Sequence, residues 1–171
     1  MKSLYESLYE SLYEGFYDNI GGISFELIDS WCKNNIDGRY RINKKTLVIS
    51  SPGSITIKNK ELTEFPSYIR FETVKGNFTC EDCDSLISLV GAPKEVGGIF
   101  LCNGCLSLKS LEGAPEKVGG GFMCYSCRSL KSLVGAPKEV GDYFNCHDCR
   151  SLTSLEGISP NIKGKVQSDI R

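Results

Sequence analysis

Eight of the nine cysteines form four Cys-x-x-Cys pairs, and thiols at this spacing are the side chains of the sequence best suited to chemistry. Two such pairs separated by about 15 to 20 residues are typical of a four-cysteine zinc site. Here 18 residues separate successive pairs. If zinc is bound, the ligands are Cys80, Cys83, Cys102, Cys105, Cys124, Cys127, Cys146 and Cys149.

The same cysteines also fit a buried core. In less regular copies of the surrounding sequence, Ile57 and Ile42 stand at the position of the first cysteine. A position that accepts isoleucine behaves as core, and buried free cysteine packs as a small hydrophobe. The copies show no odd–even difference, which zinc sites shared between pairs would require. We therefore predict structural cysteines without a metal or other cofactor, and keep zinc as the alternative.

The cysteine pairs belong to a 22-residue pattern that is repeated four times between residues 76 and 163. A fixed period of this length predicts a solenoid, in which each repeat buries its apolar face against its neighbours. Within a repeat, Phe122 and Cys124 alternate as in a strand and point inward. Cys127, Leu130 and Leu133 follow at spacings of three, which predicts a tight return of the 3₁₀ type.

These residues also carry a family resemblance. The run Phe122-x-Cys124-x-x-Cys127-x-x-Leu130 resembles the leucine-rich repeat, whose inward Asn or Cys hydrogen-bonds the turn backbone along the stack. With S-L-x-S-L-x-G-A-P-x-x-V-G-G, the repeat is similar to short leucine-rich repeats of bacteriophage and bacterial proteins, over residues 36 to 166. The opening MKSLYES resembles the starts of proteins from phages of gut bacteria. The resemblance implies a fold and no activity.

The pattern of residues 1–36 predicts one or two helices. Residues 3 to 14 repeat Ser-Leu-Tyr-Glu three times, and a spacing of four places like residues on one helical face. This helix would cap the solenoid, pair with a second copy, or dock on a partner. Its docking residues would be Leu4, Tyr5, Leu8, Tyr9, Leu12 and Tyr13. A second helix is expected from Ser24 as N-cap to about Asn34, with Leu27, Ile28 and Trp31 at helical spacing.

The predicted fold is therefore α+β, with one or two N-terminal α-helices in residues 1–36 and a leucine-rich-repeat solenoid in residues 37–171. The solenoid comprises degenerate repeats in 37–75, regular repeats in 76–163 and a C-terminal strand in 164–171. In the degenerate part, Ile55 stands where Phe78 stands, and Val74 stands where Val96 stands. A shorter copy is expected to begin at Tyr40 and Ile42.

Composition argues against several classes of partner. Twenty basic residues stand against 21 acidic ones with no basic stripe, so we predict no nucleic-acid partner. No apolar run reaches the roughly 18 residues of a membrane span, so we predict no membrane partner. The N-terminus lacks the positive start and continuous apolar stretch of a signal peptide, which predicts a cytoplasmic protein.

The sequence gives little support for catalysis. His147 is the only histidine, and its neighbour Cys146 would point to the opposite face of a strand, which prevents a Cys–His pair. No glycine-rich phosphate loop joins a strand to a helix. We therefore predict that the protein is not an enzyme.

The residues between the inward positions should face solvent on the concave sheet, the usual binding surface of a solenoid. They include an apolar and aromatic cluster with Leu101 beside Met123, which predicts a protein-binding surface. Its residues are Glu81, Ile99, Leu101, Asn103, Met123, Tyr125, Tyr143, Asn145 and His147. The alternative is that the N-terminal helix or a second subunit covers this cluster.

The expected function is a non-catalytic protein-binding module. Because the resemblance includes phage proteins, one version is a phage-encoded inhibitor of a host defence protein, located in the host cytoplasm. The alternative is a zinc-stabilised Cys-x-x-Cys repeat module with a structural or scaffolding role.

Overall fold

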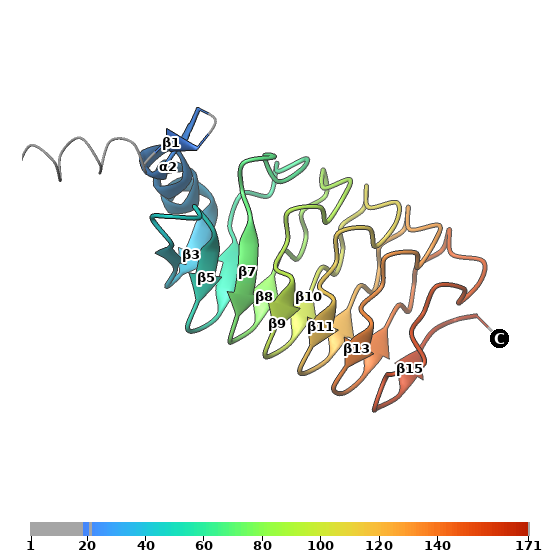
Figure 1. The fold of residues 1–171 in the computed structure, drawn as a ribbon. Helices are drawn as coiled ribbons and strands as arrows, with labels where there is room; N and C mark the ends of the chain where they lie inside the picture. The colour runs from blue at the N-terminus through green and yellow to red at the C-terminus, as the bar shows by residue number, and fades with distance from the viewer. Residues whose placement is uncertain (1–18, 21, 171) are drawn as a thin grey trace, which may run out of the picture.

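The computed structural model describes residues 19–20 and 22–170, which wind into a β-solenoid of about five turns with one short helix (Figure 1). The predicted docking helix, with Leu4 to Tyr13, lies outside the described residues. Each turn of the solenoid contributes one short strand to each of two sheets. No helix of the described residues has the length and apolar character needed to cross a membrane.

The larger sheet has seven strands in the order β15-β14-β12-β10-β8-β6-β3. All neighbours in it are parallel except β3 and β6, which are antiparallel. Its strands are β3 (Ile36–Gly38), β6 (Ile55–Ile57), β8 (Phe78–Thr79), β10 (Phe100–Leu101), β12 (Phe122–Met123), β14 (Phe144–Asn145) and β15 (Val166–Gln167).

A second sheet of six strands was not predicted as a sheet. In the regular repeats its strands are only two residues long, which is too short to show alternation in the sequence. Its strands, in chain order, are β4 (Arg41–Ile42), β5 (Ile49–Ser51), β7 (Phe71–Val74), β9 (Glu95–Val96), β11 (Lys117–Val118) and β13 (Glu139–Val140). A separate hairpin joins β1 (Asn19–Ile20) and β2 (Ile23–Ser24).

The core consists of columns of equivalent residues that run along the stack. In-register parallel pairing places Phe100 beside Phe78 and Phe122, so that identical rings stack. The ring centroids of Phe100 and Phe122 are 5.1 Å apart, and those of Phe122 and Phe144 are also 5.1 Å apart. These spacings follow the separation of neighbouring strands, about 4.8 Å. The prediction that Phe122 and Cys124 point inward is confirmed, since both are fully buried.

The return between the two sheets consists of single hydrogen-bonded turns. The amide of Leu86 donates to the carbonyl of Cys83, and the amide of Ala92 donates to that of Leu89, both at 2.9 Å. The spacing of three in the sequence reflects these bonds between residues i and i+3. It places Leu86 and Leu89 in the core, where both are fully buried.

The N-terminal end is closed by the predicted second helix, α2 (Phe25–Asn35). The side chain of Ser24 caps it by accepting the amide of Leu27 at 3.2 Å. Ile28 and Trp31 are buried, as their spacing predicted, and the Trp31 ring lies 6.2 Å from that of Phe65. Leu27, however, is exposed, so the buried face of the helix continues through Cys32 instead.

The prediction for Ile42 is wrong. Ile42 lies in β4, which forms an antiparallel hairpin with β5 in the second sheet and pairs with Ile49. It therefore does not occupy the first-cysteine column, and no repeat begins at Tyr40. Ile57 does extend that column, because Ile55 pairs with Phe78 in parallel register. The next neighbour of Ile57 is Ile36 from the antiparallel strand β3, since the first turn has to close the stack.

Candidate binding face

Eight of the nine cysteines form two buried columns inside the solenoid, and Cys32 is buried in helix α2. All nine are free and buried. The thiol of Cys105 lies 3.1 Å from the carbonyl oxygen of Cys80 in the preceding turn and donates to it. Cys127 bonds Cys102 in the same way at 3.0 Å, and Cys149 bonds Cys124 at 3.1 Å. The second cysteine of each later pair thus ties its turn to the one before.

Several of these thiols are poor nucleophiles and poor ligands as they stand, whereas hydrogen bonds with Cys80 and Cys124 lower the pKa of Cys105 and of Cys149. Burial raises the pKa of Cys83 and of Cys146 to about 11, and that of Cys32 to about 12. A hydrogen bond with Cys105, together with burial, keeps the pKa of Cys80 well above its ordinary value. Metal binding and nucleophilic attack both require the thiolate. Among the described residues, no group of three or more His, Cys, Asp or Glu side chains is arranged to hold a metal ion.

The buried thiols predict a loss of stability at alkaline pH. The unfolded chain releases thiol protons near pH 8.5 to 9, about two units below the pKa of folded Cys83 and Cys146. Their contribution to the free energy of unfolding is therefore complete below about pH 8.5 and is lost as pH rises through about 11. At about pH 10 we expect the ionisation of each of these thiols in the unfolded chain to lower the free energy of unfolding by roughly 1 kcal/mol.

Urea unfolding at pH 8 and pH 10 measures this loss. Tyrosine and lysine side chains also titrate in this range, so the control is the Cys83→Ala/Cys146→Ala variant. We expect the variant to lose less stability between the two pH values than the unchanged chain. An equal loss in both proteins would contradict the assignment of the effect to these thiols.

The outer face of the seven-stranded sheet carries the predicted binding residues. Parallel register places Leu101 beside Met123, and Met123 beside Asn145. All three side chains are half-buried, and Tyr125 in the adjacent column is 37% exposed. We call the following side chains the apolar patch: Ile99, Leu101, Met123, Tyr125 and Tyr143.

The tyrosine at the centre of the patch is held in place by its neighbours. The ring of Tyr143 lies over Gly121, where an added Cβ would be 2.6 Å from the ring carbon Cζ. Its hydroxyl reaches the sulfur of Met123 at 3.4 Å. Gly121 therefore provides the space in which the ring lies flat on the sheet. A ring already fixed in one position loses little conformational entropy when a partner binds.

Asn103 does not belong to the exposed face. It was predicted to face solvent, but only 2% of it is exposed. Its amide nitrogen donates to the Glu81 carboxylate at 3.1 Å, and its amide oxygen accepts the backbone amide of Tyr125 at 3.2 Å. The small side chain thus fits between the turns before and after it. Asn103 links neighbouring turns, and Glu81 remains at the edge of the face.

His147 is exposed at the C-terminal end of the same column. Its Nε2 lies 2.8 Å from the Asp169 carboxylate, while the neighbouring Cys146 is buried and its thiol faces the carbonyl of Gln167. The two side chains therefore point to opposite faces of the strand, as predicted. Gln167 and Asp169 were not predicted as part of this face, although they follow Asn145 and His147 by one period of 22 residues.

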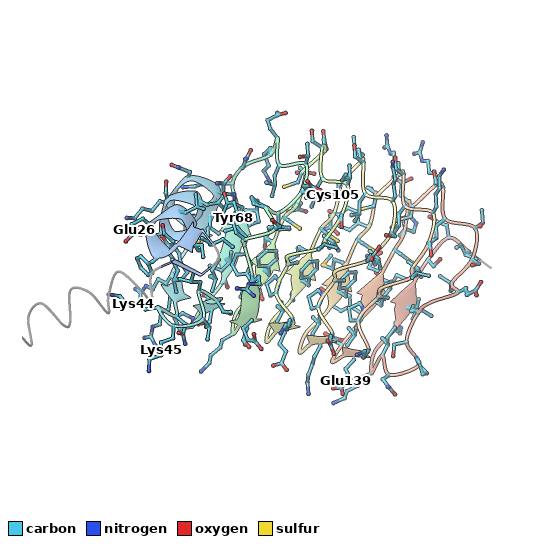
Figure 2. The ribbon with its side chains drawn as sticks, turned by 45° about the horizontal axis from the view of Figure 1, so that its top comes forward. Glu26, Lys44, Lys45, Tyr68, Cys105 and Glu139 are labelled. Atoms are coloured by element: carbon cyan, nitrogen blue, oxygen red, sulfur yellow. The ribbon has the colours of Figure 1, made fainter. Side chains whose placement is uncertain are left out.

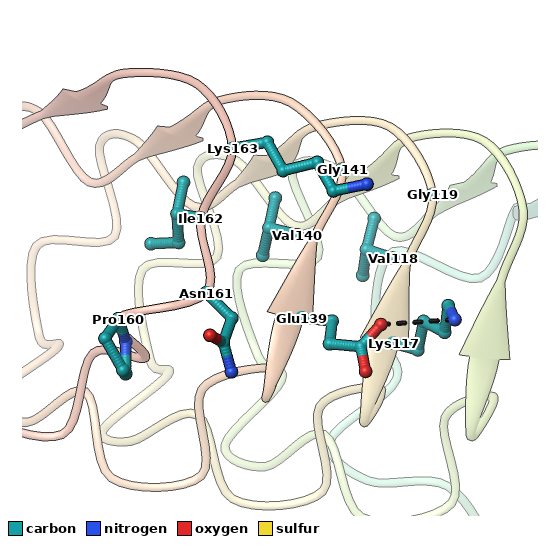
Figure 3. A pocket seen from close by; sticks show the side chains of 10 residues that line it. All are labelled: Lys117, Val118, Gly119, Glu139, Val140, Gly141, Pro160, Asn161, Ile162 and Lys163. Atoms are coloured by element: carbon teal, nitrogen blue, oxygen red, sulfur yellow. Dashed lines mark ion pairs between the residues drawn. The ribbon is translucent and has the colours of Figure 1, made fainter.

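A hollow of about 580 Å³ lies on the second sheet over the last turns (Figure 3). Its lining includes Lys117, Glu139 and Lys163. The Nζ of Lys117 lies 3.1 Å from the Glu139 carboxylate, so this lysine is already paired. A similar pair joins Lys138 to Glu116 beside this sheet.

The two faces differ in what they offer a ligand. Figure 2 shows Glu139 projecting from the outside of one side of the stack, while the sulfur atoms gather inside around Cys105 on the other. The second sheet presents paired charges, which water solvates well. The seven-stranded sheet presents apolar and aromatic side chains, which gain free energy when a partner covers them.

Comparison of the chain with models of protein families, with curated proteins and with solved structures found no match. Its function must therefore be inferred from its own residues and repeats.

Proposed function

We propose that the chain is a leucine-rich-repeat solenoid that binds another protein through the apolar patch and catalyses no reaction. The observation that carries this proposal is the half-exposed Leu101, Met123 and Tyr143 side by side on a solvent-facing sheet. Polar side chains, including Glu81 and Asn145, surround them. An aromatic and aliphatic centre with a polar rim is the usual arrangement at protein interfaces.

The leucine-rich-repeat identity is supported by two features of the turns. The strand residues Phe122 and Cys124 are both buried. The thiol of Cys127 hydrogen-bonds the backbone of the preceding turn, which is the role that the resemblance implies for an inward Asn or Cys. The same resemblance includes phage proteins, so the partner we propose is a host defence protein that the chain inhibits. This choice of partner rests on the resemblance alone.

The test begins with affinity purification of the full chain from host extract and identification of the captured proteins. Binding is then measured with the purified partner. We expect the Leu101→Asp/Met123→Asp variant to bind at least about 30-fold more weakly, since loss of a central hot spot costs about 2 kcal/mol or more. The physical reason is that two buried carboxylates would lack partners in the interface.

The matched control is Val134→Asp, which places the same charge on another exposed apolar residue, 61% exposed, outside the patch. We expect this variant to bind as the unchanged chain does. Far-UV circular dichroism and urea unfolding establish that all variants are folded. The assignment of the patch would be refuted if the Leu101→Asp/Met123→Asp variant bound the partner as tightly as the unchanged chain. It would also be refuted if Val134→Asp weakened binding as much as the patch variant does.

A further inference from the structure

The two ends of the solenoid are built differently. At the N-terminal end, the antiparallel strand β3 and helix α2 cover the core and bury Ile28 and Ile36. At the C-terminal end, β15 is the outermost strand of the seven-stranded sheet within the described residues. Val166 stands there in the phenylalanine column and is 42% exposed, whereas Phe122 in the same column is fully buried. The C-terminal end thus presents a partly open core.

The free edge of β15 has a defined set of hydrogen-bonding groups. The carbonyl oxygens of Lys165 and Gln167 accept the backbone amides of Phe144 and Cys146, at 3.0 and 2.9 Å. Because successive residues of a strand direct their backbone groups to alternate sides, Val166 and Ser168 direct theirs away from β14. No group of the described residues pairs with their backbone N–H and C=O, which are therefore available to another strand.

This edge is complementary to itself. In an antiparallel pair centred on Gln167, Val166 faces Ser168 of the second copy, and the two residues exchange both N–H and C=O hydrogen bonds. Lys165 then faces Asp169 of the second copy, and the same pair recurs on the other side of the two-fold axis. Lys165, Gln167 and Asp169 share the outer face with Asn145, since Gln167 pairs with Asn145. Opposite charges at facing positions stabilise antiparallel strands.

We propose that the chain forms a two-fold symmetric dimer by antiparallel pairing of β15 with β15 of a second copy. His147 and the backbone amide of Asp148, both in the preceding turn, already hold the carboxylate of Asp169. The half-buried Ile162 and Ile170, at the open end of the core, become further covered. Since α2 and β3 close the other end, this mode of association stops at two copies and does not continue into a fibre.

Sedimentation velocity of the full chain tests the proposal. We expect a species with the mass of two 18.9-kDa chains at micromolar concentration.

Lys165→Glu and Asp169→Lys each create like-charge pairs across the two-fold axis, and we expect the dimer of each variant alone to dissociate at least about tenfold more readily. A mixture of the two variants restores opposite charges at both positions, and we expect it to form a heterodimer. The control Lys109→Glu makes the same charge change at an exposed turn position and should leave the dimer intact.

A backbone test distinguishes this edge from other surfaces. Val166→Pro removes an N–H that points away from β14, so it removes no bond of the ladder in the monomer. We expect a folded monomer by circular dichroism and sedimentation. An unchanged chain that stays monomeric overturns the proposal. A dimer that survives both Val166→Pro and Lys165→Glu also overturns the proposal, because the two copies would then meet through another surface. The proposal is equally overturned if this edge binds a strand of a different protein instead of a second copy.

Discussion

Replacing Phe122 by alanine will lower the free energy of unfolding by about 3 to 5 kcal/mol, the usual cost of removing a buried phenylalanine. The ring is fully buried, and it stacks on Phe100 at 5.1 Å with the ring planes 1° apart. It also stacks on Phe144. Its loss leaves a cavity that neighbouring turns cannot fill, since their positions are set by the backbone ladder on both sides.

The matched control for Phe122→Ala lies in the same column. Val166 is 42% exposed at the end of the stack, so Val166→Ala should cost less than about 1 kcal/mol in the monomer. Equilibrium unfolding in urea measures both changes. Should the alanine variant be too unstable to purify, Phe122→Leu will show a smaller loss in the same direction. Equal losses at Phe122 and Val166 would show that the column is not the source of stability.

The second large effect is expected at Gly135. Its φ is +89°, in the region that side chains with a Cβ rarely adopt, and an added Cβ would lie 2.6 Å from the Cα of Glu112. Left-handed backbone costs a residue with a Cβ about 1 to 2 kcal/mol, and overpacking costs about 1 to 3 kcal/mol. Gly135→Ala will therefore lower the free energy of unfolding by about 2 to 5 kcal/mol.

Gly53→Ala is the control for this substitution. Gly53 has no positive φ, and an added Cβ would have no atom within 4 Å. Alanine there should leave stability unchanged or raise it by up to about 1 kcal/mol, because it restricts the unfolded chain. Urea unfolding of both variants, compared at equal pH, gives the difference. If Gly135→Ala proves as stable as Gly53→Ala, the backbone at Gly135 must be able to move away from Glu112 in the preceding repeat.

The repeat period made most of the core predictable. In a stack of parallel turns in register, residues one period apart occupy the same environment. The burial of Phe78 and Cys80 therefore applies to every later copy, and all four copies agree. The outward positions followed from alternation in the same strands. Asn103 is the exception, because its side chain is short enough to bond the backbone of the next turn instead of reaching solvent.

The ends of the stack were less predictable for a physical reason. A terminal turn has a neighbour on one side only, so it must close the core by contacts that the period does not describe. Ile42 thus lies in a hairpin of the second sheet rather than in the cysteine column. Strand β3 forms the end of the seven-stranded sheet and pairs with β6 in the antiparallel direction. The exposed edge of β15 at the other end likewise becomes evident only when the hydrogen bonds of Lys165 and Gln167 are seen.

The Cys-x-x-Cys pairs illustrate the division between sequence and tertiary structure. The sequence by itself determined the period, the inward position of each first cysteine and the preference for core over metal as a prediction. Only the tertiary structure decided that the Cys105 thiol bonds the carbonyl of Cys80 and that the return strands form a second sheet. The reason is that a repeat period specifies which residues are equivalent, whereas contacts between turns depend on how the backbone bends within each one.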